Sequence, residues 1–240
     1  MPDVYAHYRF GRQVLSHFSP RQRQVIGRFR RLYDMGLYGA DIFSFYNPFW
    51  QTDTGALVET YAGSTPESFR KRAREGALTE GEQACLCGLC AHYALEAACG
   101  DYREKLEKSG VSPAAAWAEF DRYLLELDGL SLHYDRSAHM ALTRGECVTA
   151  AQFFPPATAV QTHGAIRRME KFYHALATAQ SDSGKFPLSL VKNTPLASRI
   201  LTGTPTQEDI HRDSALLVRY TRGVKEFPQT LETWFSGTNG

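Results

Sequence analysis

The amino-acid sequence predicts an all-α fold, with several helices in a single domain over residues 1–240. Helix-starting signals are frequent, apolar residues recur at helical spacing over long segments, and no segment alternates apolar and polar residues long enough to suggest a sheet. A chain of this length can bury one substantial core. No free linker or internal repeat divides it, so we expect one domain.

Capping residues before prolines mark four expected helix starts, because their hydroxyls accept hydrogen bonds from free N–H groups and proline suits the first helical position. These pairs are Ser19-Pro20, Thr65-Pro66, Ser112-Pro113 and Thr204-Pro205. Thr79 and Glu82 form a capping box for a further helix that runs to about Cys99. Apolar residues lie on most sides of this helix, so we expect it to be central and largely buried.

The remaining segments divide into helices and two loops. Apolar periodicity predicts helices over Tyr5 to His17, Ala114 to Leu127, Thr158 to Gln180, Gln207 to Val224 and Pro228 to Phe235. Glycine and aromatic residues predict a loop over Gly36 to Thr54, and serine, proline, glycine and threonine predict a second loop over Ser181 to Pro205.

Composition and charge exclude several classes of protein. The 27 basic and 26 acidic residues give a net charge of +1, whereas nucleic-acid-binding proteins usually carry a basic excess or stripe. The densest basic run, Arg21 to Arg31, is expected to be the exposed face of a short helix, with a phosphate- or lipid-binding patch as the alternative. No stretch is apolar for long enough to span a bilayer, and the N-terminus lacks a secretory pattern.

The five cysteines favour a cytoplasmic protein. Their number is odd, and Cys85, Cys87, Cys90 and Cys99 lie close together, which suits reduced thiols better than a disulfide framework. We interpret them as buried, inert thiols. The alternative is that Cys85 and Cys99, seven residues either side of His92, supply zinc ligands from nearly the same helical face.

His92 and Glu96 are the first candidates for chemistry. Residues four apart project from the same face of a helix, so one rigid element would present two metal ligands at a fixed distance. Their neighbours from Leu89 to Leu95 are mostly apolar, and a buried carboxylate needs a partner or a metal. The alternative is a structural or solvent-facing role for both residues.

Two other segments, around His7 and Asp41, extend this set. His7 opens the run His7-Tyr8-Arg9-Phe10-Gly11, and Asp41 lies in the glycine-hinged loop Gly39-Ala40-Asp41-Ile42-Phe43. With Met1-Pro2-Asp3 and Leu89-Cys90-Ala91-His92-Tyr93-Ala94-Leu95, these runs resemble the cytoplasmic bacterial branch of the zinc-dependent phospholipase C family in order and spacing. The motifs are concentrated in residues 1–130.

The resemblance implies an all-helical fold with a cluster of zinc ions that bind a substrate phosphate and generate the attacking hydroxide. It places metal ligands at His7, Asp41 and His92, and Asp41 could also act as the catalytic base. Glu96 stands where the family has an aspartate that bridges two metals.

The sequence departs from the family pattern at several expected ligands. No histidine is present near Tyr61-Ala62-Gly63, Gly100-Asp101-Tyr102 replaces a His-Pro-Tyr run, and Pro113 and Trp117 stand where a histidine and a glutamate are expected. Neither proline nor tryptophan binds zinc. We therefore expect a reduced site in which His7, Asp41, His92 and Glu96 hold one zinc or another divalent ion.

These features predict a zinc-dependent phospholipase C-like protein that hydrolyses phosphoesters with a one-metal site. Its expected substrate is a phosphate-containing small molecule or a phospholipid headgroup. The alternative, from another functional class, is a catalytically inactive family member that binds a small molecule or a protein. The sequence itself does not separate these two.

Overall fold

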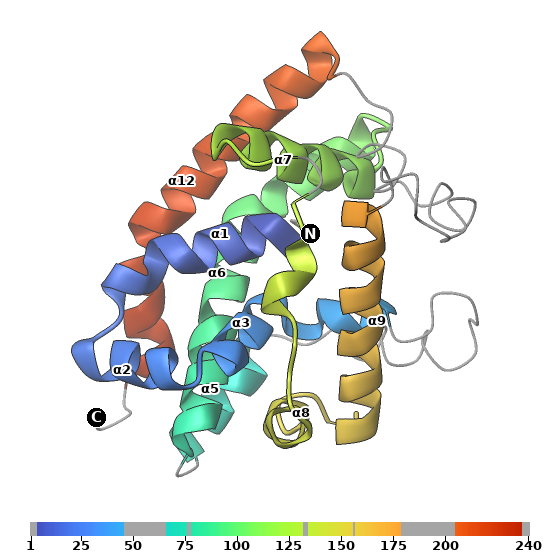
Figure 1. Cartoon of the computed structure of the whole chain (residues 1–240). Helices are drawn as coiled ribbons and strands as arrows, with labels where there is room; N and C mark the ends of the chain where they lie inside the picture. The colour runs from blue at the N-terminus through green and yellow to red at the C-terminus, as the bar shows by residue number, and fades with distance from the viewer. Residues whose placement is uncertain are drawn as a thin grey trace.

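All regular structure in the described part of the chain is helical, which confirms the predicted all-α class (Figure 1). The computed structural model describes residues 4–45, 66–75, 78–131, 134–155, 157–178 and 205–236. The α-helices in these ranges are α1 (Val4–Gln13), α2 (Pro20–Arg28), α3 (Arg30–Tyr38), α5 (Pro66–Glu75), α6 (Glu80–Lys108), α7 (Pro113–Leu127), α8 (Arg144–Ala151), α9 (Ala159–Thr178) and α12 (Gln207–Phe235). Three 3₁₀ helices accompany them: η1 (Val14–His17), η2 (Gly39–Phe45) and η3 (Arg136–His139). Within the described residues, no helix has the length and apolarity needed to cross a membrane.

Capping boxes set five of the helix starts in the described residues. In each, the side chain of the capping residue accepts a hydrogen bond from the backbone N–H three residues on, and the side chain of that later residue accepts one in return. The capping residues are Ser19, Thr79, Thr143, Thr158 and Thr206. The box at Thr79 was predicted. The expected start at Thr204-Pro205 is wrong, because Thr206 caps α12 with Asp209 and the helix begins at Gln207.

Helix α6 lies at the centre, where α1, α2, α3 and α12 pack against it (Figure 1). Its closest crossing is with α3 at two glycines. A Cβ on Gly88 would lie 2.1 Å from the Tyr33 carbonyl oxygen, and one on Gly36 would lie 2.2 Å from that of Cys85. Only glycine allows the two backbones to approach this closely.

Three predicted boundaries are wrong. The expected loop from Gly36 is helical as far as Phe45, because Gly36 is a contact point inside α3, while residues 46–54 lie outside the described part. Helix α6 continues past Cys99 to Lys108. Helix α12 runs unbroken from Gln207 to Phe235 although Pro228, which lacks an N–H group, lies inside it.

Aromatic side chains fill much of the core. Phe43, expected in an aromatic loop, is fully buried and meets Phe154 edge to face with ring centroids 5.5 Å apart. Phe227 of α12 packs against Phe10 and Phe18 in the same geometry. Such edge-to-face pairs stabilise a core beyond the area they bury.

Candidate metal centre

Three predicted metal ligands converge from separate elements. His7 of α1, Asp41 of η2 and His92 of α6 each offer a ligand atom, and these atoms all lie within 4.8 Å of one another. His7 is 2% exposed and His92 is 3% exposed, whereas Asp41 is half-buried. Two imidazoles and one carboxylate form a common donor set for a divalent cation such as zinc.

The two imidazole rings lie face to face, with centroids 4.5 Å apart and an interplanar angle of 19°. Both ring nitrogens of His7 are buried and form no hydrogen bond. Buried polar atoms nearly always have a partner in native proteins, and an unsatisfied one costs about 1–3 kcal/mol. A cation beside His7 would supply that partner, so the residues present fit a metal.

Contact with the end of α3 fixes the orientation of His92. Its Nδ1 lies 3.0 Å from the Leu37 carbonyl oxygen, which can only accept, so Nδ1 carries the proton and donates it. Nε2 then keeps its lone pair, which is the arrangement that second-shell carbonyls impose on metal-binding histidines. Burial, with a contribution from His7, lowers the pKa of His92 to about 4, so the ring is neutral at physiological pH.

Gly39 allows the turn from α3 into η2 to lie directly on the His92 ring. Its backbone has φ 55° and ψ −140°, which side-chain-bearing residues rarely adopt. A Cβ at this position would lie 2.8 Å from His92 Nε2. The same glycine leads the chain to Asp41, so one turn positions two of the three candidate ligands.

Asp121 of α7 positions His7 by holding the first turn of α1. Its two carboxylate oxygens accept hydrogen bonds from the backbone N–H groups of Tyr5 at 3.0 Å and Ala6 at 2.7 Å. Arg136 adds a charged contact, with Nε 3.3 Å from Asp121 Oδ2. A carboxylate at a helix N-terminus satisfies free N–H groups and complements the helix dipole.

Glu96, predicted as a fourth ligand, lies next to this group without being part of it. Its Oε1 is 3.6 Å from His7 Nε2, and its ligand atoms are not within the shared distance of the other three residues. Burial raises the pKa of Glu96, but His7 and His92 outweigh it and hold the pKa below its usual value. Glu96 is therefore an anionic neighbour of His7.

Tyr93 links the centre to α12. Its ring meets that of His92 edge to face, with centroids 5.0 Å apart. Burial raises the pKa of Tyr93, and the charges of Asp41 and Glu96 raise it further. Its ring stacks on Trp234 with centroids 6.0 Å apart. The C-terminal turn of α12 therefore packs directly beside the centre.

Comparison with known proteins identifies no relative. No family model matches the chain. Neither the curated proteins nor the solved structures include a significant match. The centre is therefore interpreted from its side chains alone.

The five cysteines lie outside the centre, and all are free and buried. Burial raises the pKa of Cys85 to about 12 and, with a contribution from Glu96, that of Cys99 to about 12. Thiols in this state stay protonated and are poor metal ligands. This agrees with the interpretation of the cysteines as inert core residues.

The departures from the family pattern have structural roles where the structure describes them. Pro113 begins α7, and Trp117 is buried with its ring 6.5 Å from that of Tyr102. Residues 61–63 lie outside the described part. The roles of Leu37, Gly39 and Asp121 were not predicted, since each depends on a contact between segments far apart in the sequence.

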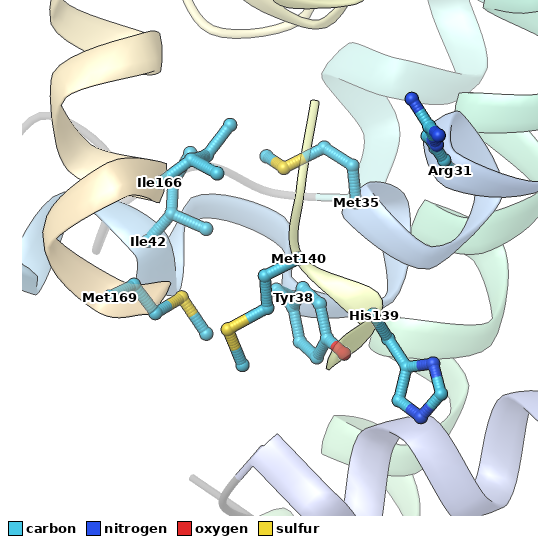
Figure 2. A pocket seen from close by; sticks show the side chains of 8 residues that line it. All are labelled: Arg31, Met35, Tyr38, Ile42, His139, Met140, Ile166 and Met169. Carbon is cyan, nitrogen blue, oxygen red and sulfur yellow. The ribbon is translucent and has the colours of Figure 1, made fainter. Parts of the chain in front are cut away.

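A crevice between α3, η2 and α9 is a different feature from the centre. It is too narrow to hold a water molecule, and Figure 2 shows methionine side chains reaching into it. Methionine commonly fills irregular gaps in cores, so we interpret the crevice as a packing gap. The lining residues are Arg31, Met35, Tyr38, Ile42, His139, Met140, Ile166 and Met169.

Proposed function

We propose that this protein is a metal-dependent phosphoesterase-like protein that holds a single divalent cation, with zinc as the expected ion. The observation that carries the proposal is the convergence of His7, Asp41 and His92, with the His92 proton fixed on Nδ1 by the Leu37 carbonyl. The resemblance of the ordered motifs to those of zinc-dependent phospholipases C supplies the reaction class.

Each residue has a distinct role in the proposed site. His7 and His92 bind the cation as neutral imidazoles, and Asp41 adds the negative charge that a divalent ion needs. Asp41, the most exposed of the three, also accepts the proton of the attacking water. Glu96 acts on His7 as an anionic neighbour, because its Oε1 lies 3.6 Å from Nε2 and its negative charge favours a cation beside that ring.

The bound ion would supply two contributions, a lowered pKa for a coordinated water and charge stabilisation of a phosphate oxygen. The expected substrate is a phosphodiester or another phosphate ester, including a phospholipid headgroup. Pro113 and Trp117 replace two ligands expected for companion metals. Turnover should therefore be slow compared with that of multi-metal phosphodiesterases, in which two ions stabilise both the attacking and the leaving oxygens.

A non-catalytic binding protein is the second candidate. The near-complete burial of both imidazoles favours it, because a catalytic ion needs an open position that substrate can reach. In this case the cation would hold α1, η2 and α6 together and would not turn over a substrate.

Metal content tests the proposal directly. Tag-free protein should carry about one equivalent of a divalent metal by mass spectrometry, and the His92→Ala variant should lose it. His174→Ala is the matched control, because His174 is exposed and pairs with Asp135 away from the centre. Metal-free wild-type protein, even after reconstitution with zinc, would contradict the proposal.

Substrate turnover then separates the two candidates. Metal-loaded protein should hydrolyse a chromogenic phosphodiester, and Asp41→Asn should abolish this activity. Stoichiometric metal without hydrolysis of any phosphoester in a broad screen would favour the binding protein. Glu96→Gln should weaken metal affinity roughly tenfold without abolishing binding, as expected for a residue that acts through His7.

A further inference from the structure

A group of buried charged side chains lies at the interface of α7 and α12, outside the candidate metal centre. Glu119 of α7 is 2% exposed, and Asp209 and Asp213 of α12 are each 1% exposed. Carboxylates are almost never this buried unless they are paired, because their desolvation is costly. The partners of each acid therefore decide its charge.

Two arginines pair with two of the three acids. Arg122, which is 3% exposed, contacts Glu119 Oε1 through Nε at 2.6 Å. Arg212 pairs with Asp209, and Asp209 Oδ2 also accepts a hydrogen bond from the Thr206 N–H at 2.9 Å. Arg122 also contacts Glu126, and Arg212 also contacts Glu208, but these two acids are exposed to solvent. Among the buried side chains, one negative charge is in excess, and it belongs to Asp213.

Asp213 has no hydrogen-bond partner for either carboxylate oxygen, and Glu119 Oε2 also has none. Three acceptor atoms without a donor are thus buried at one interface. A single proton on Asp213 would resolve this, since it removes the excess charge and turns one of the three acceptors into a donor. Two neighbouring carboxyl groups commonly share one proton in this way.

We propose that the packing of α12 on α7 is a proton-controlled latch, in which Asp213 is protonated and donates a hydrogen bond to Glu119 Oε2 while the latch is closed. Loss of this proton places two carboxylates together in the interface and loosens the first half of α12. The latch is independent of the proposed phosphoesterase function.

The charges around Asp213 support this assignment. Burial raises the pKa of Asp213 to about 7, Glu119 and Asp209 add to the shift, and Arg122 and Arg212 oppose it. On α6, burial raises the pKa of Tyr102, the charges of Arg212 and Arg219 oppose this, and the charge of Asp213 adds to it. Proton loss from the folded protein therefore falls near neutral pH.

The sign of the pH effect follows from these values. Between pH 4 and pH 7 the folded protein holds a proton on Asp213 that the unfolded chain has released, so rising pH favours unfolding. Linkage predicts that the folded-to-unfolded ratio falls up to about tenfold per pH unit in this window. Below and above it, Asp213 contributes no pH dependence.

The decisive comparison is between wild-type protein and Asp213→Asn, because the amide mimics a protonated carboxyl and can still donate to Glu119. Chemical unfolding between pH 4.5 and 8 should show the wild type losing stability relative to the variant as pH rises. Asp101→Asn makes the same chemical change at an exposed aspartate of α6 and should leave this pH profile unchanged. Equal pH profiles for wild type and Asp213→Asn would overturn the proposal.

Carbon-13 NMR of the aspartate carboxyl groups gives a second measurement, which stays informative if Asp213→Asn fails to fold. The Asp213 resonance should titrate near neutral pH, and Glu119→Gln should lower its midpoint by removing the neighbouring charge. A midpoint below pH 5 in wild-type protein would contradict the latch. Stabilisation of the wild type at pH 8 by millimolar Mg²⁺ or Ca²⁺, absent in Asp213→Asn, would show a cation site and would also overturn it.

Discussion

The two halves of α6 are stabilised in different ways. From Gly81 to Leu95 most side chains are buried, and this half crosses α3 at Gly36 and Gly88 and carries His92. After Cys99 only Leu106 is buried, and ion pairs four residues apart, such as Arg103–Glu107 and Lys108–Glu104, follow the exposed surface. Tertiary packing holds the first half, whereas local charge pairs and helix propensity extend the second.

This difference explains why the helix was predicted to end at Cys99. Apolar periodicity reports burial, and burial ends there although the helix does not. Replacing glycine with alanine should therefore have opposite effects on the free energy of unfolding in the two halves of α6.

The largest expected effect is that of Gly88→Ala in the buried half. The new Cβ would meet the Tyr33 carbonyl oxygen at 2.1 Å, and a backbone atom cannot rotate away, so α3 and α6 must separate. We expect a loss of about 3 kcal/mol in the free energy of unfolding, measured with denaturant. In Gly100→Ala the Cβ would meet nothing within 4 Å, and this control should gain about 0.5–1 kcal/mol from helix propensity. Equal losses in the free energy of unfolding for Gly88→Ala and Gly100→Ala would show that the two halves of α6 are not stabilised differently.

Gly39→Ala should have a smaller effect on stability and a specific one on the metal centre. A side chain in this sparsely populated backbone conformation costs about 1–3 kcal/mol, and the new Cβ would press on His92 Nε2. Gly110, with φ 73° and open space around it, is the control for a side chain at positive φ without the contact to His92. We expect metal affinity, measured by competition with a chromophoric chelator, to fall at least about tenfold in Gly39→Ala only. The same affinity in both variants would exclude a positioning role for Gly39.

The smallest effect is expected for Asp101→Asn in the exposed half. Arg219 contacts Asp101 through Nε and Nη2, both at 3.1 Å, but the Asp101 side chain is 54% exposed. Exposed pairs contribute little, so we expect a loss of about 0.5 kcal/mol or less at neutral pH, reduced further by salt. The hydrogen bonds from Arg219 lower the pKa of Asp101, so this contribution is lost only at acidic pH. A loss comparable to that of Gly88→Ala would contradict the comparison.

Local signals predicted much of the fold. The box at Thr79 and the cap at Ser112 act within one helical turn, so α6 and α7 were placed at the correct starts. The local signals were wrong at one glycine and one proline. Gly36 indicated a loop although it is the contact point of a helix crossing, and Pro228 indicated a break that α12 does not make.

The candidate centre was predictable in its residues but not in its arrangement. His7, Asp41 and His92 were expected from ordered motifs, and the structure brings them together. Glu96 shares the helical face of His92, yet its position next to His7 depends on how α1 lies across α6. Sequence periodicity cannot show contacts between residues that are far apart in the chain. The contact of Leu37 with His92, that of Asp121 with α1 and the burial of Asp213 against α7 are all of this kind.

The wide spacing of the three ligands along the chain has a consequence for folding kinetics. His7, Asp41 and His92 are 34 and 51 residues apart in sequence (41 − 7 and 92 − 41), so bringing them together carries the entropic cost of closing two long loops, which the packing of three separate elements must offset. The complete ligand set exists only once α1 and η2 have docked on α6. A cation at this position would therefore be captured late in folding, and its arrival would mark the completed assembly of the N-terminal helices.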